Sequence, residues 1–133
     1  MLDYETAMPL IIKLGRAEGP RFVVKVELAG SLDTTTAPEL ERQLVPILAG
    51  TIKDMVFDLA QLKFVSSAGI RIFAKARKTM RDRGGQASFI RLQPQIKEVF
   101  DIIQALPGLN VFRDEAEMDA YLAARQKTHE PKA

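Results

Sequence analysis

The sequence predicts a single α/β domain in which helices cover a mixed, mainly parallel β-sheet. Segments with strand-like alternation and segments with helical periodicity follow one another along most of the chain. The length of 133 residues is close to the commonest size of one domain. Hydrophobic residues make up 47% and charged residues 27% of the chain, which is typical of an ordinary globular protein.

A β-hairpin is expected first. Residues 10–14 form a short apolar strand, and residues 17–20 are typical of a turn. Residues 22–28 then place valine and leucine side chains on one face and charged side chains on the other. This alternation predicts a half-buried second strand that pairs with the first.

The first helix is predicted to begin near Thr36. The segment from Thr36 to Glu39 matches a capping box, and Pro38 loses no helical hydrogen bond in the first turn. Pro46 is expected to loosen the last turn, and Gly50 is well placed to end the helix.

The remaining elements follow in alternation. They are a strand at 53–59, a helix at 66–83 ended by Gly84 and Gly85, a strand at 87–92, a helix from Pro94, a short strand at 109–112, and a helix from Asp114 whose Met118, Tyr121 and Leu122 face inward. The order is β-β-α-β-α-β-α-β-α, about five strands and about four helices, with right-handed crossovers. One core is expected to contain Val24, Val26, Leu28, Val56, Ile72, Phe73, Ile96, Val99 and Phe100. The domain is predicted to span 9–125, between an N-terminal extension (1–8) and a flexible polar tail (126–133).

The composition excludes several classes of function. The net charge is +2 and the basic residues are mixed with acidic ones, so no nucleic-acid-binding surface is predicted. The absence of cysteine excludes disulfides, thiolate metal sites and cysteine nucleophiles. The first residues are acidic where a signal peptide is basic, and no apolar stretch is long enough to span a bilayer. We expect a cytoplasmic monomer or weak dimer that needs no cofactor and does not insert into a membrane.

The segment from Asp58 to Ile70 contains the principal candidate site. A strand ends in this segment, and Ser66 and Ser67 follow where a helix starts. One serine that caps the helix is the simplest interpretation, but two adjacent serines should leave one hydroxyl free. A phosphate on a serine here would be stabilised by the unpaired N–H groups and the positive dipole end of the helix.

A second polar loop contains Ser31, Asp33 and Thr34, which are common turn-forming residues. This loop and the serine pair both follow strands of the predicted sheet. We therefore expect them at the same sheet edge, with Asp33 near Ser67 on one exposed face.

Ser67 is not predicted to be a hydrolase nucleophile. The nucleophile elbow has a glycine two residues before the serine and another two residues after it, whereas here Val65 precedes and Gly69 follows. The single histidine, His129, lies in the polar tail and is badly placed to serve as a buried base. We expect no catalytic residue and no metal site.

Two segments together resemble the STAS domain, and specifically the bacterial anti-sigma-factor antagonists. Residues 27–44 look like that family's strand, turn and first helix, and residues 56–85 look like its phosphorylation segment, second helix and glycine pair. The short strand at 109–112 fits the order as well, so the resemblance runs from about Phe22 to Leu122. The resemblance implies the STAS fold.

The resemblance further implies a partner switch rather than an enzyme. The unmodified form is expected to bind an anti-sigma factor with serine kinase activity, which phosphorylates Ser67 and then dissociates. A metal-dependent serine phosphatase is expected to reset the protein. By the same resemblance, the partner-binding surface is expected to contain Ser31, Asp33, Thr34, Ser66, Ala68, Gly69 and Arg71.

The chain departs from the best-known members of that family at three positions. Ser66 stands where they have an acidic residue, Ala68 replaces a frequent Ser or Thr, and Arg71 replaces a frequent Gly. Two alternatives stay open. One is a STAS subunit that docks to a membrane transport system, and the other is an enzyme or small-ligand carrier that uses the Asp33 and Ser67 patch.

Overall fold

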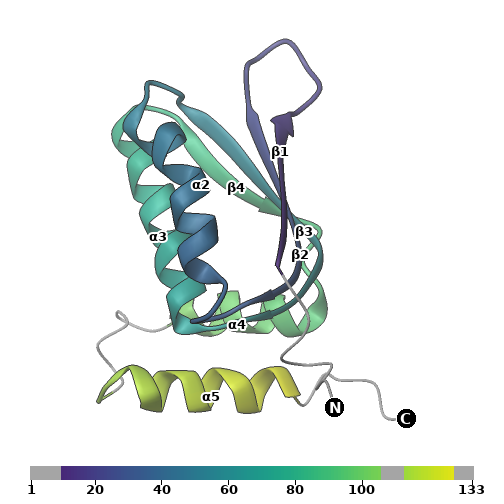
Figure 1. Cartoon of the computed structure of the whole chain (residues 1–133), viewed down its shortest axis with the longest axis vertical. Coiled ribbons are helices and arrows are strands. Elements are labelled where there is room, and N and C mark those ends of the chain that lie inside the picture. The colour runs from purple at the N-terminus through teal and green to yellow at the C-terminus, as the bar shows by residue number, and fades with distance from the viewer. Residues whose placement is uncertain (1–9, 106–112, 128–133) are drawn as a thin grey trace.

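The computed structural model of the chain describes residues 10–105 and 113–127, and it has an α/β fold (Figure 1). The elements are β1 (Ile11–Arg16), β2 (Val24–Leu32), α2 (Ala37–Ala49), β3 (Asp54–Val65), α3 (Ser67–Asp82), β4 (Gln86–Ile90), α4 (Pro94–Ala105) and α5 (Glu115–Lys127). The predicted fold class is confirmed, with four strands among the described residues instead of about five. The short strand predicted at 109–112 lies outside the described residues.

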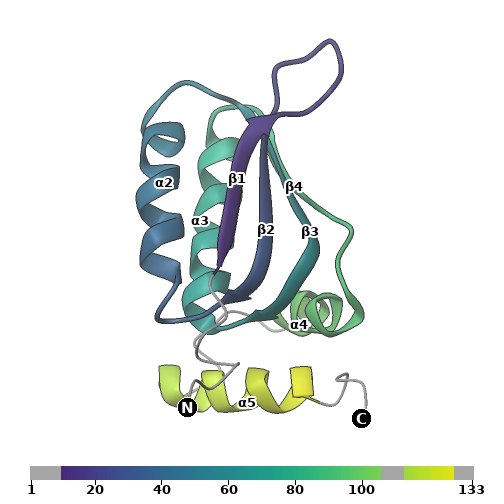
Figure 2. The ribbon, with the colours of Figure 1, turned by 45° about the vertical axis from the view of Figure 1, so that its right-hand side comes forward.

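The four strands form one sheet in the order β1-β2-β3-β4. The β1–β2 pair is antiparallel, as predicted for the hairpin, and the β2–β3 and β3–β4 pairs are parallel. Helices α2 and α3 cover one face of this sheet (Figure 2). Helices α4 and α5 lie instead at the end of the domain where β2 and β3 finish (Figure 1). The carboxyl ends of the parallel strands are therefore covered by helices.

Four phenylalanines pack together beside β3 and β4, two of them buried and two partly buried. Phe57 stacks on Phe89 with ring centroids 5.1 Å apart, and Phe73 meets both rings edge-on at 5.2 Å. Phe100 from α4 closes the group, 5.1 Å from Phe89 and 5.8 Å from Phe73. Offset and edge-to-face pairs of this kind stabilise a core beyond the area that they bury.

The predicted core is confirmed at most positions. Phe100 is partly buried and packs against the core cluster, whose buried members include Val24, Val26, Leu28, Ile72, Phe73, Ile96 and Val99. Val56 was wrongly placed, because it lies on the opposite face of β3 from Met55 and Phe57, which belong to the core cluster.

Strand β3 is much longer than the strand predicted at 53–59, because it continues to Val65. The register between β2 and β3 shifts twice, between Glu27 and Ala29 and again between Gly30 and Ser31. Each shift breaks the two-residue alternation that identifies a strand in a sequence. The sequence pattern therefore predicts a strand that ends at residue 59, six residues before β3 ends.

The two glycines that follow α3 are required for different physical reasons. Gly84 has a φ of +81°, in the left-handed region that favours glycine. Gly85 donates its N–H to the Met80 carbonyl at 2.9 Å, and a Cβ atom on Gly85 would lie 1.8 Å from the Lys53 carbonyl oxygen. The prediction that this pair ends the helix is confirmed.

Helix α5 differs from its prediction in two residues. Met118 and Leu122 are buried as expected, but Tyr121 is 41% exposed. Gln126 was assigned to the flexible tail, yet it lies within α5 and is only 3% exposed. Helix geometry explains both errors. Residues four apart lie on the same face of a helix, so residues 118, 122 and 126 share one face and residue 121 lies at the side of that face.

Truncation of Phe73 tests this core. Phe73→Ala should lower the free energy of unfolding by about 3–5 kcal/mol, because it leaves a cavity among the other three rings. The matched control is Phe22→Ala, which removes a 57% exposed ring that contacts Arg16 and should cost less than about 1 kcal/mol. Urea unfolding of both variants measures the difference. Equal stability of Phe73→Ala and the parent protein would contradict the proposed core.

Candidate functional site

The turn between β2 and α2 is held by Asp33. Its Oδ1 atom accepts hydrogen bonds from the backbone N–H groups of Thr35 at 2.9 Å and Thr36 at 3.1 Å. The Asp33 N–H donates to Thr36 Oγ1 at 3.0 Å, and that hydroxyl donates to the Ser31 carbonyl at 2.7 Å. The carboxylate of Asp33 therefore shapes the turn, as an Asx turn does.

The capping box predicted from Thr36 to Glu39 does not form. Thr36 makes no side-chain capping hydrogen bond to α2, because its hydroxyl is engaged with Ser31 and Asp33. Glu39 instead accepts hydrogen bonds from Arg42 and Gln43, which hold the pKa of its carboxyl at about 2. The side chain that organises the start of α2 is thus Asp33.

The two polar loops meet at one edge of the sheet, as predicted. The Ser66 N–H donates to the Leu32 carbonyl at 2.9 Å, which joins the end of β2 to the start of α3. Gly69 permits this close approach, because a Cβ atom there would lie 2.7 Å from side-chain atoms of Leu32 and Val65. The serine pair is therefore brought beside the Asp33 turn.

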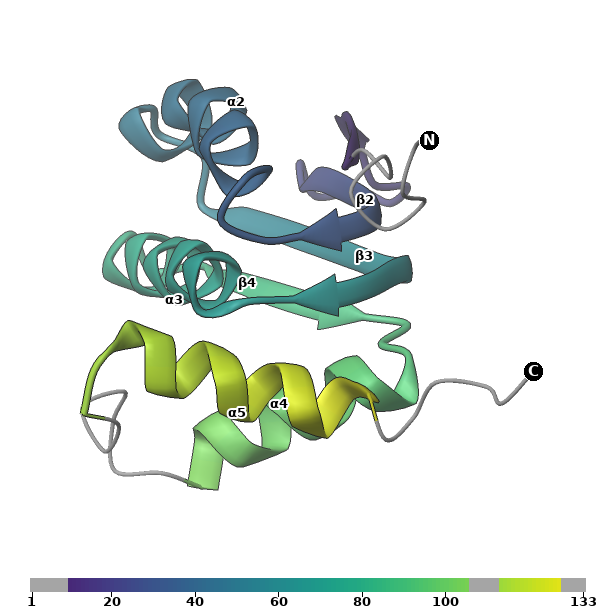
Figure 3. The ribbon, with the colours of Figure 1, turned by 60° about the horizontal axis from the view of Figure 1, so that its bottom comes forward.

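The expectation of an exposed serine site is wrong. Ser66 is 5% exposed and Ser67 is 1% exposed. Helix α5 lies across this end of the domain and packs against α3 and α4 (Figure 3). Of the other residues predicted for the partner surface, Thr34 and Arg71 are exposed, Ser31, Asp33 and Ala68 are half-buried, and Gly69 is buried.

The start of α3 is capped by α5 and not by a serine. The Ser67 N–H donates to Oδ1 of Asp119, at 2.9 Å. Ser66 occupies the capping position but makes no capping hydrogen bond, and among the described residues its buried Oγ has no hydrogen-bond partner. The expectation that one serine of the pair caps the helix and leaves the other hydroxyl free is therefore wrong, because neither serine caps α3.

Gln126 ties α5 to the last residue of β3. Its Oε1 accepts from the Val65 N–H at 2.8 Å, and its Nε2 donates to the Val65 carbonyl at 2.8 Å and to the Leu122 carbonyl at 3.1 Å. The side-chain amide thus pairs with β3 in the way that a neighbouring strand would. Met118 and Leu122 bury apolar area beside this contact.

Sequence reasoning missed Asp119 and Gln126. A polar Gln126 at the next helical repeat after Met118 and Leu122 is a weak signal that an amide side chain faces inward. Asp119 gives no such signal, because its partner Ser67 lies 52 residues away in the sequence.

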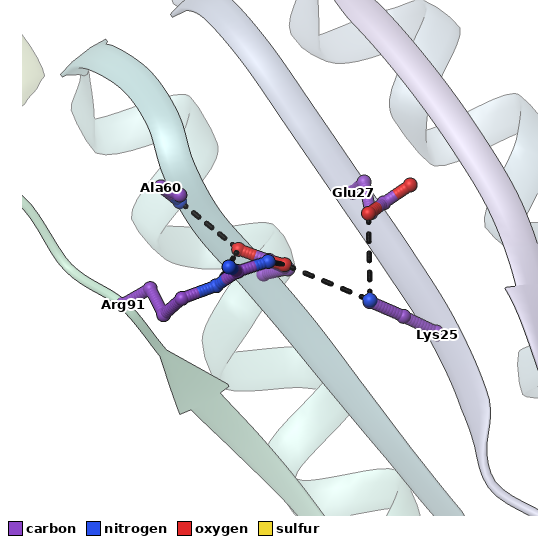
Figure 4. A network of polar contacts seen from close by, with 5 residues as sticks. Lys25, Glu27, Ala60 and Arg91 are labelled. Atoms are coloured by element: carbon purple, nitrogen blue, oxygen red, sulfur yellow. Dashed lines mark hydrogen bonds and ion pairs between the residues drawn. The ribbon is translucent and has the colours of Figure 1, made fainter. Parts of the chain in front are cut away.

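A separate polar network lies on the sheet at β2, β3 and the end of β4 (Figure 4). Asp58, only 3% exposed, accepts hydrogen bonds from the Arg91 guanidinium and from the Ala60 N–H at 3.1 Å. The Lys25 ammonium lies 3.8 Å from the same carboxylate and 3.4 Å from Glu27. The hydrogen bond from Arg91 is the main cause that lowers the pKa of Asp58, against the opposing effect of burial. This network links three strands, and we assign it a structural role.

Within the described ranges, no three His, Cys, Asp or Glu side chains are grouped so as to hold a metal ion. None of the helices in the described part of the chain is long and apolar enough to cross a membrane.

Comparison with known proteins matches the STAS domain family model to residues 16–118. The chain is 32% identical over 75 residues to a candidate anti-sigma factor antagonist, BtrV, of Bordetella bronchiseptica, a match that covers 56% of this chain and 65% of that protein. It is 30% identical over 79 residues to the anti-sigma-B factor antagonist of Bacillus subtilis, which covers 59% and 72% of the two chains.

Solved structures of SpoIIAA, an anti-sigma factor antagonist, have the same fold. The unphosphorylated form gives a TM-score of 0.57 at 17% identity, covering 69% of this chain and 83% of SpoIIAA. The phosphorylated form of this Bacillus protein gives 0.56 at 17% identity, covering 69% and 82%.

The Asp58 network predicts a dependence of stability on pH. Because the pKa of Asp58 is lower in the folded protein than the usual value of about 3.9, its contribution to stability is present above about pH 4 and is lost as the pH falls through the folded pKa. Asp58→Asn should therefore flatten the fall in the free energy of unfolding below about pH 4. Urea unfolding across this range measures the slope.

Arg91→Ala provides the companion measurement, because it removes the main cause of the lowered pKa and leaves the carboxylate in place. It should also flatten the acid slope. A slope in Asp58→Asn equal to that of the parent protein would contradict this assignment.

Proposed function

Since the chain belongs to the STAS domain family, we propose that it is an anti-sigma-factor antagonist that works by partner switching. In this proposal the unphosphorylated protein binds an anti-sigma factor with serine kinase activity. Phosphorylation of Ser67 releases the partner, and a metal-dependent serine phosphatase restores the binding form. Both sequence relatives are named as anti-sigma factor antagonists, which supports the proposal.

The observation that carries the proposal is the position of Ser67 at the first residue of α3. The first N–H groups of a helix have no partner within the helix, and the dipole places positive charge there. The Asp119 carboxylate already accepts the Ser67 N–H, so this backbone group does bind an anion. A phosphate on Ser67 would use the same electrostatics.

The proposed partner surface surrounds this position. Thr34 on the β2–α2 turn is exposed, and Arg71 on the next turn of α3 is exposed as well. Asp33 contributes by holding the turn in shape rather than by a free carboxylate. A partner that packed over this edge would have to desolvate a phosphate on Ser67, which weakens binding unless the partner offers a compensating cation.

The alternative function, docking to a membrane transport system, is not better supported by these observations than the partner switch is. A catalytic patch of Asp33 and Ser67 is not favoured, because the Asp33 carboxylate is engaged by backbone N–H groups.

The proposal is tested on protein purified from its native cells. Mass spectrometry should find phosphate on Ser67 in the parent chain and none in Ser67→Ala. Ser66→Ala is the matched control, since it alters the adjacent hydroxyl, and it should keep the modification. The unmodified Ser67→Ala protein should retain the anti-sigma factor in a pull-down, whereas Ser67→Glu should bind it more weakly.

Two results would contradict the proposal. Loss of phosphate in Ser66→Ala with retention in Ser67→Ala would move the site by one residue. Equal partner binding by the parent, Ser67→Ala and Ser67→Glu proteins would remove the phosphorylation switch.

A further inference from the structure

We infer that α5 is a displaceable cap over the serine site: Ser67 becomes accessible only when α5 moves away, and a negative charge on Ser67 keeps α5 displaced. The capping contact itself is independent of the proposed function. Its regulatory meaning rests on the proposed phosphorylation of Ser67.

The first argument is access. With α5 in place, Ser67 is 1% exposed, so a kinase cannot reach its hydroxyl and a partner cannot contact it. Helix α5 contacts this residue directly, because its Asp119 accepts the Ser67 N–H at 2.9 Å. A reaction on Ser67 therefore requires that this contact opens first.

The second argument is charge and space. A phosphoryl group adds three acceptor oxygens and close to two negative charges at neutral pH. Ser67 is only 1% exposed, and the Asp119 carboxylate already accepts its N–H group. Two anions at one helix start repel each other, and the burial of Ser67 reduces the screening of this repulsion by water. Phosphate and Asp119 therefore exclude each other.

The third argument concerns the anchors that attach α5. Asp119 and Gln126 supply its polar anchors to the serine site and β3, and Met118 and Leu122 supply the apolar ones. Arg125 adds an ion pair with Glu98 of α4. A helix of 13 residues that packs on α3 and α4 at the end of the domain can open locally without global unfolding.

The site also contains a polar atom that the closed state leaves unsatisfied. The Oγ atom of Ser66 is buried and has no hydrogen-bond partner among the described residues. A buried hydroxyl without a partner costs free energy, and an open state that admits water to Ser66 would relieve this cost. The closed state is thus held less tightly than its hydrogen bonds to Ser67 and Val65 alone would imply.

The absence of cysteine from the chain allows a direct test of the cap. Ser67→Cys introduces a single thiol, and Thr34→Cys introduces one at an exposed position of the adjacent loop. The rate of reaction with dithionitrobenzoate is measured in buffer and normalised to the rate in urea. Ser67→Cys should react at least about tenfold more slowly than Thr34→Cys, because reaction waits for opening. A helix start lowers the pKa of a thiol and speeds its reaction, so a slow rate reports burial.

Removal of the anchors should abolish this protection. Asp119→Ala combined with Gln126→Ala in the Ser67→Cys chain should bring its rate close to that of Thr34→Cys. Ala124→Ser, at an exposed position of α5, is the control that should leave the rate unchanged. Circular dichroism verifies that each variant is folded. Equal rates for Ser67→Cys and Thr34→Cys, or no acceleration on removal of the anchors, would overturn the cap.

A second thiol position tests the effect of charge. Met118→Cys places the thiol under α5, where the parent residue is 4% exposed. Its reaction should be slow alone or with Ser67→Ala, and at least about tenfold faster with Ser67→Glu. Leu122→Cys serves in the same way if Met118→Cys does not fold. Equal rates with Ser67→Ala and Ser67→Glu would overturn the displacement by charge.

These outcomes are separable from failure of the proposed function. Slow thiol reaction together with an unphosphorylated Ser67 in native cells would leave the cap and refute the phosphorylation switch. Fast reaction of Ser67→Cys together with phosphate on Ser67 would leave the switch and refute the cap.

Discussion

The unequal length of β3 and β4 is the constraint on which the rest of the structure depends. β3 has 12 residues and β4 has five, and β4 pairs only with the first part of β3, from Asp54 to Asp58. Beyond Asp58 one edge of β3 still pairs with β2, and the backbone groups on its other edge need other hydrogen-bond partners where they are buried. Glutamine side chains supply the partners: Gln93 donates to the Ala60 carbonyl, Gln95 to the Lys63 carbonyl, and Gln126 pairs with both groups of Val65.

This solution explains why the serine site is covered. β3 must run past β4 to deliver Ser66 and Ser67 to the end of β2, where the Ser66 N–H meets the Leu32 carbonyl. The glutamines that satisfy the extension belong to α4, to the segment before it, and to α5, so these helices are drawn to the same end of the domain. Satisfying the backbone of β3 and concealing Ser67 are therefore consequences of one arrangement.

The parts of this fold that the sequence predicts are those set by local chemistry. The helical repeats, the Gly84–Gly85 stop and the hairpin depend on residues close together in the chain, and their patterns identify them. The end of β3 escaped prediction because two register shifts break its alternation, and the capping box failed because Asp33 offers the Thr36 N–H group a competing acceptor. Gln126 was read as part of a polar tail because its partner Val65 lies 61 residues away. Long-range hydrogen bonds of this kind leave almost no pattern in the sequence.

The displaceable cap formed by α5 affects how tightly a partner binds the serine site. If a partner binds only the open state, its apparent affinity equals its affinity for that state multiplied by the fraction of molecules in which α5 is displaced. The linkage is reciprocal. Opening of α5 raises the affinity for such a partner, and binding of the partner shifts the equilibrium of α5 toward the open state by the same factor. Asp119 is always present beside Ser67 at the high effective concentration of a group on the same chain, so closure does not depend on protein concentration. The stability of one short helix would in this way set the threshold for both phosphorylation and partner binding at α3.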